Sequence, residues 1–202
     1  MVNRVAEGFT NTKLKTDGLS PVDRGYIARI EVPAASAVVA NTTAVLAAVT
    51  STALTQVITT GITSPAYARN ITATAGGTAA DIKAIQVIIE GTNMDNEVIT
   101  ETLPAFTVDT AGTVAGTKAF RTVTKVTIPA HDGTGATTAI GFGEVLGIPY
   151  KLAHNSVLLA YHNNVREGTL PTVTTSATVL ESNTFDLNTA LNGSKVDVYL
   201  VV

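Results

Sequence analysis

The side chains that most often carry out chemistry are few in this sequence, and their spacing does not favour catalysis. The three histidines are His131, His154 and His162. His131 stands in a Gly/Thr turn, with no second histidine at metal-ligand spacing. His154 and His162 bracket a predicted strand, and at about 3.3 Å per residue they would lie roughly 26 Å apart on one face. A shared metal ion would therefore need a second copy of the chain across a symmetry axis.

The acidic residues do not form a plausible hydrolytic pair. Glu97 and Glu101 would project from one face of a strand about 13 Å apart, whereas the carboxyl groups of a glycosidase lie about 5–9.5 Å apart. Asp109 and Glu144 are the other candidate pair. No serine has a G-x-S-x-G context, and zero cysteines exclude thiol catalysis, zinc–thiolate sites and disulfides. We therefore expect no enzymatic activity, no cofactor and no metal.

A cluster of oxygen-bearing side chains occurs at Asn93, Asp95, Asn96 and Glu97. A calcium-binding loop of the D-x-[DN]-x-[DN]-G type requires a glycine that this segment lacks. The cluster is therefore interpreted as the polar tip of a β-hairpin. The glycines of Gly141-Phe-Gly143 are interpreted as strand-bend glycines, because no helix follows them to hold a phosphate.

Composition indicates an all-β protein. The 202 residues include 34 Thr, 28 Ala and 24 Val, and no Trp. Thr and Val are stiff at χ1 and suit a pleated surface. The run 121–128 alternates apolar residues with Thr or charged ones, which is typical of antiparallel sheets with one buried face and one face covered by Thr. Small side chains gain less from burial, so we expect stability to depend on sheet hydrogen bonds and on burial against partners.

The charge balance argues against nucleic acid and membrane as partners. The formal net charge is −3, and only 14% of the residues are charged. Binding phosphates requires a basic face, which no window of the sequence provides. No segment is apolar for long enough to span a bilayer, and the first residues lack the apolar core of a signal peptide. The low charge predicts a surface that is either Thr-rich or covered by partners.

The turn signals divide the chain into short strands and predict an antiparallel β-sandwich or barrel-like body, or two packed β units. Residues 44–49 could form a capped helix or a buried strand. We expect a main β domain at 26–150 and C-terminal strands at 151–202 that pack on the body or complete it. The predicted strands are 26–32, 56–60, 69–75, 83–90, 97–103, 118–129, 137–143, 156–161, 172–179 and 195–202.

Residues 1–25 differ from the rest of the chain. They carry charged residues without apolar periodicity, and Gly18 and the Ser20-Pro21 step interrupt any regular element. Such a segment is either a solvated terminus or an extended arm that lies on a neighbour. If it is an arm, its basic residues are the candidate contacts: Arg4, Lys13, Lys15 and Arg24.

Four segments resemble virion proteins of tailed bacteriophages, of the type that decorates the capsid. Residues 62–74 resemble a strand introduced by "P…RN(I/V)T", and 88–103 resemble the phage hairpin "GTD..G..ITETI". Residues 116–129 are similar to the "TKAFKTVTSV" strand that follows this hairpin in the phage proteins. Residues 181–194, which precede the final strand, are the fourth segment with this resemblance. The hairpin tip departs from the pattern, because residues 93–96 replace the usual Asp/Gly turn.

The resemblance implies a structural protein of the virion. Its expected location is the capsid surface after synthesis in the host cytoplasm, and its expected role is to stabilise the icosahedral shell by bridging capsomers. The implied partners are the major capsid protein and further copies of the chain, and the expected oligomer is a trimer at three-fold positions. The alternative is a tail-tube or fibre/receptor-binding component, since the hairpin pattern also occurs in tail proteins.

Overall fold

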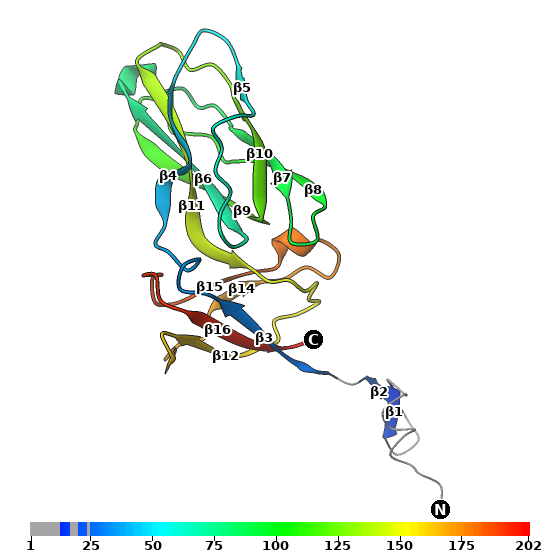
Figure 1. Ribbon diagram of the computed structural model, residues 1–202. Helices are drawn as coiled ribbons and strands as arrows, with labels where there is room; N and C mark the ends of the chain where they lie inside the picture. The colour runs from blue at the N-terminus through cyan, green and yellow to red at the C-terminus, as the bar shows by residue number, and fades with distance from the viewer. Residues whose placement is uncertain (1–12, 17–19, 24) are drawn as a thin grey trace, which may run out of the picture.

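The computed structural model describes residues 13–16, 20–23 and 25–202, and this part of the chain is all-β, as the sequence predicts (Figure 1). Its only helical segments are two 3-10 turns, η1 (Ala79–Asp81) and η2 (Leu180–Ser182). No helix of the described residues is long and apolar enough to cross a membrane. The strands are β1 (Lys13–Thr16), β2 (Ser20–Asp23), β3 (Ile27–Val32), β4 (Asn41–Thr50), β5 (Gln56–Ile58), β6 (Arg69–Gly77), β7 (Ile88–Thr92), β8 (Val98–Thr102), β9 (Gly112–Phe120), β10 (Thr122–Ile128), β11 (Ala136–Gly147), β12 (Val157–His162), β13 (Val165–Arg166), β14 (Thr172–Thr174), β15 (Thr184–Asp186) and β16 (Val196–Val201).

The described strands pair antiparallel throughout. Three sheets form the body, with the orders β5-β10-β7-β8, β14-β15-β11-β6-β9 and β13-β12-β16-β3, and β4 also pairs with β11. Strands β1 and β2 form a separate two-stranded ladder, which Figure 1 shows apart from the body.

The first two sheets pack face to face around one hydrophobic cluster. Val123, Val126 and Ile128 of β10 are buried while the Thr and Lys residues between them are not. A register shift between Val123 and Lys125 brings Val123 to the same face as the other two. Ile71 and Ala73 of β6 face them from the opposite sheet and are fully buried. Residues 44–49 lie in β4, so the ambiguous segment is a strand and not a helix.

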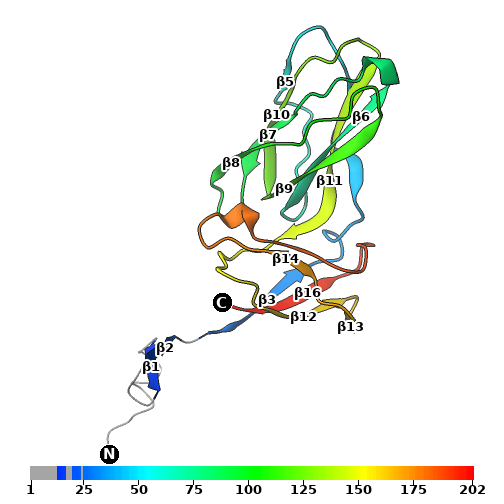
Figure 2. The same cartoon turned by 180° about the vertical axis from the view of Figure 1, so that it is seen from behind.

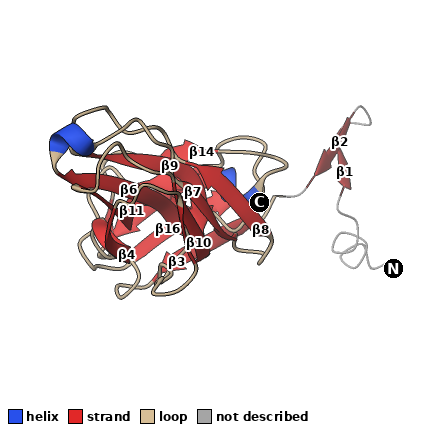
Figure 3. Ribbon diagram, turned by 90° about the horizontal axis from the view of Figure 1, so that it is seen from above, coloured by secondary structure: helices blue, strands red, loops and turns tan. Residues whose placement is uncertain are grey.

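The third sheet covers a second hydrophobic cluster at one end of the molecule (Figure 2). Its inner face includes Ile30 of β3, Ala160 of β12 and Val198 of β16, all buried. Leu146 and Phe185, both 0% exposed, pack on this face from the neighbouring sheet. Viewed from above, strands of the first two sheets overlie the third sheet, which contains β3 and β16 (Figure 3).

The two clusters do not divide the chain at residue 150. Strand β3 pairs with β16, so residues 27–32 belong with the C-terminal strands. Strand β11 serves both clusters, since Ile140 lies in the first and Leu146 in the second. The molecule is therefore better described as two cores joined by a shared strand than as an N-terminal domain followed by C-terminal strands.

The predicted single strand over 118–129 is wrong. The extended segment is interrupted at Arg121, and β9 and β10 on either side of it lie in different sheets of the sandwich. The backbone N–H of Arg121 donates to the carbonyl of Thr92, which ties the crossing point to β7. A Cβ at Gly91 would collide with the carbonyl of Thr122, so this close approach needs glycine. The sequence does not reveal this interruption, because no Gly or Pro occurs between 117 and 128.

The predicted strand over 172–179 is also too long, because only residues 172–174 are extended in β14. The remainder wraps around Asn183, whose side chain is fully buried. The Asn183 amide accepts hydrogen bonds from the N–H groups of Leu152 and Ser176 and donates to the carbonyls of Ser176 and Val179. One side chain thus replaces the partners that a sheet would supply to this loop.

The C-terminal segment is a core strand, as the alternation of 195–202 predicts. Strand β16 lies between β12 and β3, and Val196, Val198 and Leu200 are 0% exposed. Val202 does not belong to the buried face and is 41% exposed, because β16 ends at Val201.

Removal of residues 195–202 should make the protein insoluble or lower its Tm far below that of the full chain. The truncation separates β12 from β3 and exposes the second core, and each lost aliphatic side chain is worth about 1.5–3 kcal/mol. Val202→Ala, which keeps the strand, should leave the Tm nearly unchanged. Thermal unfolding followed by circular dichroism measures both, and an unchanged Tm in the truncated protein would show that β16 is peripheral.

Candidate functional site

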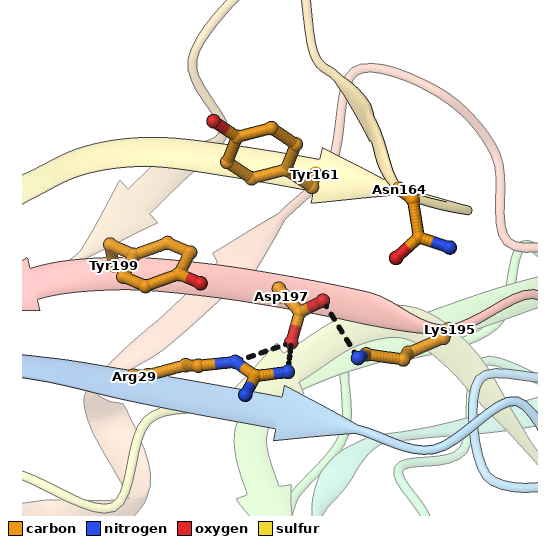
Figure 4. A pocket seen from close by; sticks show the side chains of 6 residues that line it. All are labelled: Arg29, Tyr161, Asn164, Lys195, Asp197 and Tyr199. Atoms are coloured by element: carbon orange, nitrogen blue, oxygen red, sulfur yellow. Dashed lines mark hydrogen bonds and ion pairs between the residues drawn. The ribbon is translucent and has the colours of Figure 1, made fainter.

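The outer face of the third sheet carries a pocket of about 300 Å³ (Figure 4). Its lining side chains come from β3, from β16 with the residue before it, from β12 and from the turn after β12. They are Arg29, Tyr161, Asn164, Lys195, Asp197 and Tyr199. Register explains their meeting, because Arg29 lies opposite Tyr199 and Asp197 lies opposite Tyr161. Paired residues of an antiparallel sheet project from the same face.

Asp197 is the centre of an ion network on this face. Its side chain is only 9% exposed, and its Oδ1 accepts from the Arg29 Nε at 2.8 Å and lies 2.6 Å from the Arg29 Nη2. Its Oδ2 lies 3.2 Å from the Lys195 Nζ. The hydrogen bond to Asp197 raises the pKa of Arg29 despite the opposing effect of desolvation. Both carboxylate oxygens are therefore engaged by cations, and Asp197 is poorly placed to act as a base.

Two tyrosines form the other wall of the pocket. The rings of Tyr161 and Tyr199 meet edge to face, with centroids 6.1 Å apart at 78°. Asn164 reaches the pocket from a two-residue turn in which both Asn163 and Asn164 have positive φ angles. This geometry is that of a type I′ hairpin, for which asparagine is well suited. The pocket thus offers aromatic surface and hydrogen-bond donors, and no nucleophile paired with a base.

The sequence did not single out this pocket, because Arg29 lies 168 residues before Asp197 in the chain. Alternation with the buried Val196 and Val198 places the Asp197 side chain on the outer face of β16, yet its partner Arg29 could be found only from the β3–β16 register.

The three histidines are not brought together. His131 is buried, stacks on Phe106 with ring centroids 6.0 Å apart, and accepts a hydrogen bond from the N–H of Lys83 at its Nδ1. Its Nε2 therefore carries the proton toward the Thr138 hydroxyl. His162 is buried in the second core, and His154 is exposed. No group of three or more His, Cys, Asp or Glu residues in the described chain could hold a metal ion.

The acidic residues have structural partners. The Glu101 carboxylate accepts hydrogen bonds from the N–H groups of Thr117 and Lys118 and so covers the edge of β9. Glu144 accepts from the N–H groups of Ala40 and Leu191. Neither contact places a carboxylate beside its proposed acidic partner.

The cluster at 93–97 is the tip of the β7–β8 hairpin. The buried Asn93 side chain accepts hydrogen bonds from the N–H groups of Asp95 and Glu97 and donates to the Glu97 carboxylate. Asn96 has a φ of 64°, so asparagine supplies the left-handed residue that an Asp/Gly turn would otherwise provide. The departure from the phage hairpin pattern is therefore compatible with a tight turn.

The candidate arm contacts are only partly within the described chain. Arg4 and Arg24 lie outside the described residues. Lys13 and Lys15 lie in β1, where the structure defines the backbone pairing with β2.

Buried Arg69 is a residue that sequence reasoning missed. It is 1% exposed, donates from Nη1 to the carbonyl of Val38 at 3.1 Å, and lies over the ring of Phe142 at 4.3 Å. Desolvation lowers its pKa to about 10, and the charge of Glu144 partly offsets this effect. Arg69 thus fastens the 33–40 connection to the strand shared by the two cores.

Comparisons with known proteins give no relative. No family model matches the chain, and neither a curated protein nor a solved structure matches it.

Asp197→Asn should lower the free energy of unfolding by about 1–3 kcal/mol, because it removes the buried carboxylate that contacts both Arg29 and Lys195. Glu31→Gln is the matched control. Glu31 contacts the same cations but is 47% exposed, and exposed pairs contribute about 0–1 kcal/mol. Urea unfolding at pH 7 measures both variants, and equal losses would refute the central role of Asp197.

Stability should also depend on His131. Desolvation lowers its pKa in the folded protein, while the charge of Asp132 acts in the opposite direction. The unfolded chain then binds a proton more readily, so stability should be lost as the pH falls from about 6.5 toward the folded pKa. His131→Asn should flatten this decline, whereas exposed His154→Asn should keep it. Urea unfolding between pH 7.5 and 5 provides the comparison, and an unchanged slope in His131→Asn would contradict the prediction.

Proposed function

We propose that this protein is a structural component of a tailed-phage virion that decorates the capsid and stabilises it by bridging capsomers. The four phage-like segments support this role. Three of them overlap β6, the β7–β8 hairpin, and the end of β9 together with β10. Asp197 is paired with cations, Glu101 and Glu144 accept backbone hydrogen bonds, and the histidines lie apart. These observations favour a structural over a catalytic role.

The observation that carries the proposal is the outer face of the β5-β10-β7-β8 sheet. Ladder pairs place Val98, Thr92 and Thr122 in one row, and Thr102, Ile88, Thr127 and Val57 in another. Between them Glu90 and Lys125 form an ion pair, so the middle of the face carries no net charge. Val98 and Val57 are 81% and 61% exposed. We call this outer surface of the β5-β10-β7-β8 sheet the Thr-rich face. Its methyl and hydroxyl groups and its lack of net charge suit docking on another protein.

Binding of this kind stabilises an assembled shell by mass action. Surface buried between the decorating protein and two neighbouring capsomers must be exposed again before those capsomers separate. The stabilisation therefore grows with the concentration of bound subunits and is a property of the assembled particle. Residues 1–25 would add a second attachment through Arg4, Lys13, Lys15 and Arg24, as an arm that reaches a neighbouring subunit.

A fibre or receptor-binding role is the second candidate, and the tyrosine pocket is the observation that favours it. Two aromatic rings beside Arg29, Lys195 and Asn164 could hold a small ligand that accepts hydrogen bonds. The pocket is charged and lies on the third sheet, away from the Thr-rich face. The two roles therefore make separate use of the molecule.

Two variants should weaken binding to expanded shells that lack decoration. Deletion of residues 1–24 removes the proposed arm, and Val98→Glu places a charge on the Thr-rich face. Val165→Glu is the matched control, because Val165 is 68% exposed on β13 in the third sheet. Co-sedimentation with shells measures binding, after circular dichroism has confirmed folding.

We expect each of the first two variants to weaken binding at least tenfold and Val165→Glu to bind normally. Normal binding of the deletion variant would refute the arm. Normal binding of Val98→Glu would refute the docking face, and failure of the unmodified protein to bind any shell would refute the decoration role.

A further inference from the structure

Strand β3 is the edge of the third sheet, and its outer backbone groups can be identified. Tyr26 and Val202 exchange two hydrogen bonds, each N–H donating to the other's carbonyl at 2.9 Å. In an antiparallel ladder the residues that bond to the partner alternate. Residues 28, 30 and 32 therefore face β16, and the N–H and C=O groups of Ile27, Arg29 and Glu31 point away from the sheet.

This edge is open among the described residues, which form no backbone hydrogen bond to the outer side of β3. The edge of β9 is different, because the Glu101 carboxylate accepts from the outer N–H groups of Thr117 and Lys118. An open edge with regular alternation is a template for pairing with another strand. The only charged side chains of β3 are Arg29 and Glu31, on its exposed face.

We propose that β3 pairs antiparallel with β3 of a second copy of this chain, with Ile30 opposite Ile30 on a two-fold axis. The outward groups of Arg29 then bond to those of the partner's Glu31, and the reverse pair forms by symmetry. The ladder ends beyond this pair, because Pro33 has no N–H and its carbonyl already accepts from the N–H groups of Ser36 and Ala37. The result is one eight-stranded sheet across two subunits.

Charge selects this register over its neighbours. With Ile30 on the axis, Arg29 lies opposite the partner's Glu31, and opposite charges that face each other across strands are favourable. A two-residue shift in either direction places Arg29 opposite Arg29 or Glu31 opposite Glu31. A one-residue shift would turn the apolar residues of one strand to the charged face of the other.

The buried face of β3 supports the same register. Ile30 would face its own copy, and Ala28 would face the partner's Val32. Ile30 and Val32 already belong to the second hydrophobic cluster, and Ala28 packs on it. Pairing would therefore extend an existing apolar layer from one subunit to the next without burying an unpaired charge.

The pairing does not depend on the proposed role in a phage particle. A two-fold contact gives a dimer in solution, and this differs from the trimer implied by the phage resemblance. On a particle, the same contact could join subunits that belong to neighbouring three-fold positions.

Single cysteines test the register directly, because the natural chain has none. Ile30→Cys places two thiols at a directly opposed pair with a Cα separation of about 4.5 Å, within the range of a disulfide. Ile27→Cys is the matched control. Ile27 is 70% exposed, but its two copies would lie six residues apart along the pair, about 20 Å.

On mild oxidation of the full chain, we expect most of Ile30→Cys to run as a disulfide-linked dimer on non-reducing gels, and at least tenfold less of Ile27→Cys. A mixture of Ile27→Cys with Pro33→Cys should give a linked heterodimer even if Ile30→Cys folds poorly. Equal cross-linking of the two single variants, or none in Ile30→Cys and in the mixture, would overturn the proposal.

Charge reversal provides an independent measurement. Glu31→Lys places like charges opposite Arg29 of the partner and should raise the dimer dissociation constant at least tenfold, measured by sedimentation equilibrium. Glu31→Gln should raise it less. A monomeric unmodified chain at 100-micromolar concentration, or identical dissociation constants for the three proteins, would contradict the pairing.

Discussion

The fold depends on β11, the one strand that the two hydrophobic cores share. It pairs with β4 and β6 along the first core and with β15 at its end, where Leu146 enters the second core. The cation of Arg69 lies on Phe142 of the same strand, near the point where one core gives way to the other. Because both cores use β11, neither is an independent domain, and displacement of either lobe would break its ladder.

Because many side chains of this protein are small, hydrogen bonds from buried polar side chains hold several of its loops in place. Gly91 permits the crossing of β10 past β7, and Asn93 and Asn183 satisfy loop backbones from fully buried positions. Such side chains replace missing ladder partners where the chain leaves a sheet. The same composition leaves Thr and Val side chains exposed on faces of the molecule. Faces of this kind are suited to contacts with neighbouring proteins.

Local alternation and turn residues were enough to predict the all-β class, the β7–β8 hairpin and the burial of the last strand in a core. It could not show that the chain changes sheets at Arg121, because residues on both sides favour extended structure and no Gly or Pro between 117 and 128 marks the change. It could not assign β3 to the second core either, since that depends on a pairing with residues 196–201. The pocket around Asp197 is a product of the same long-range register, and no local motif marks it.

The central claim is that this chain is a building element of a viral particle and acts through its faces, edges and arm. The most direct test is an electron cryomicroscopy map of purified phage particles from an infection in which this chain is produced. The account predicts density for this fold on the outside of the capsid, with the β5-β10-β7-β8 face toward the shell. Density for the chain only in the tail, or its absence from purified particles, would contradict the account.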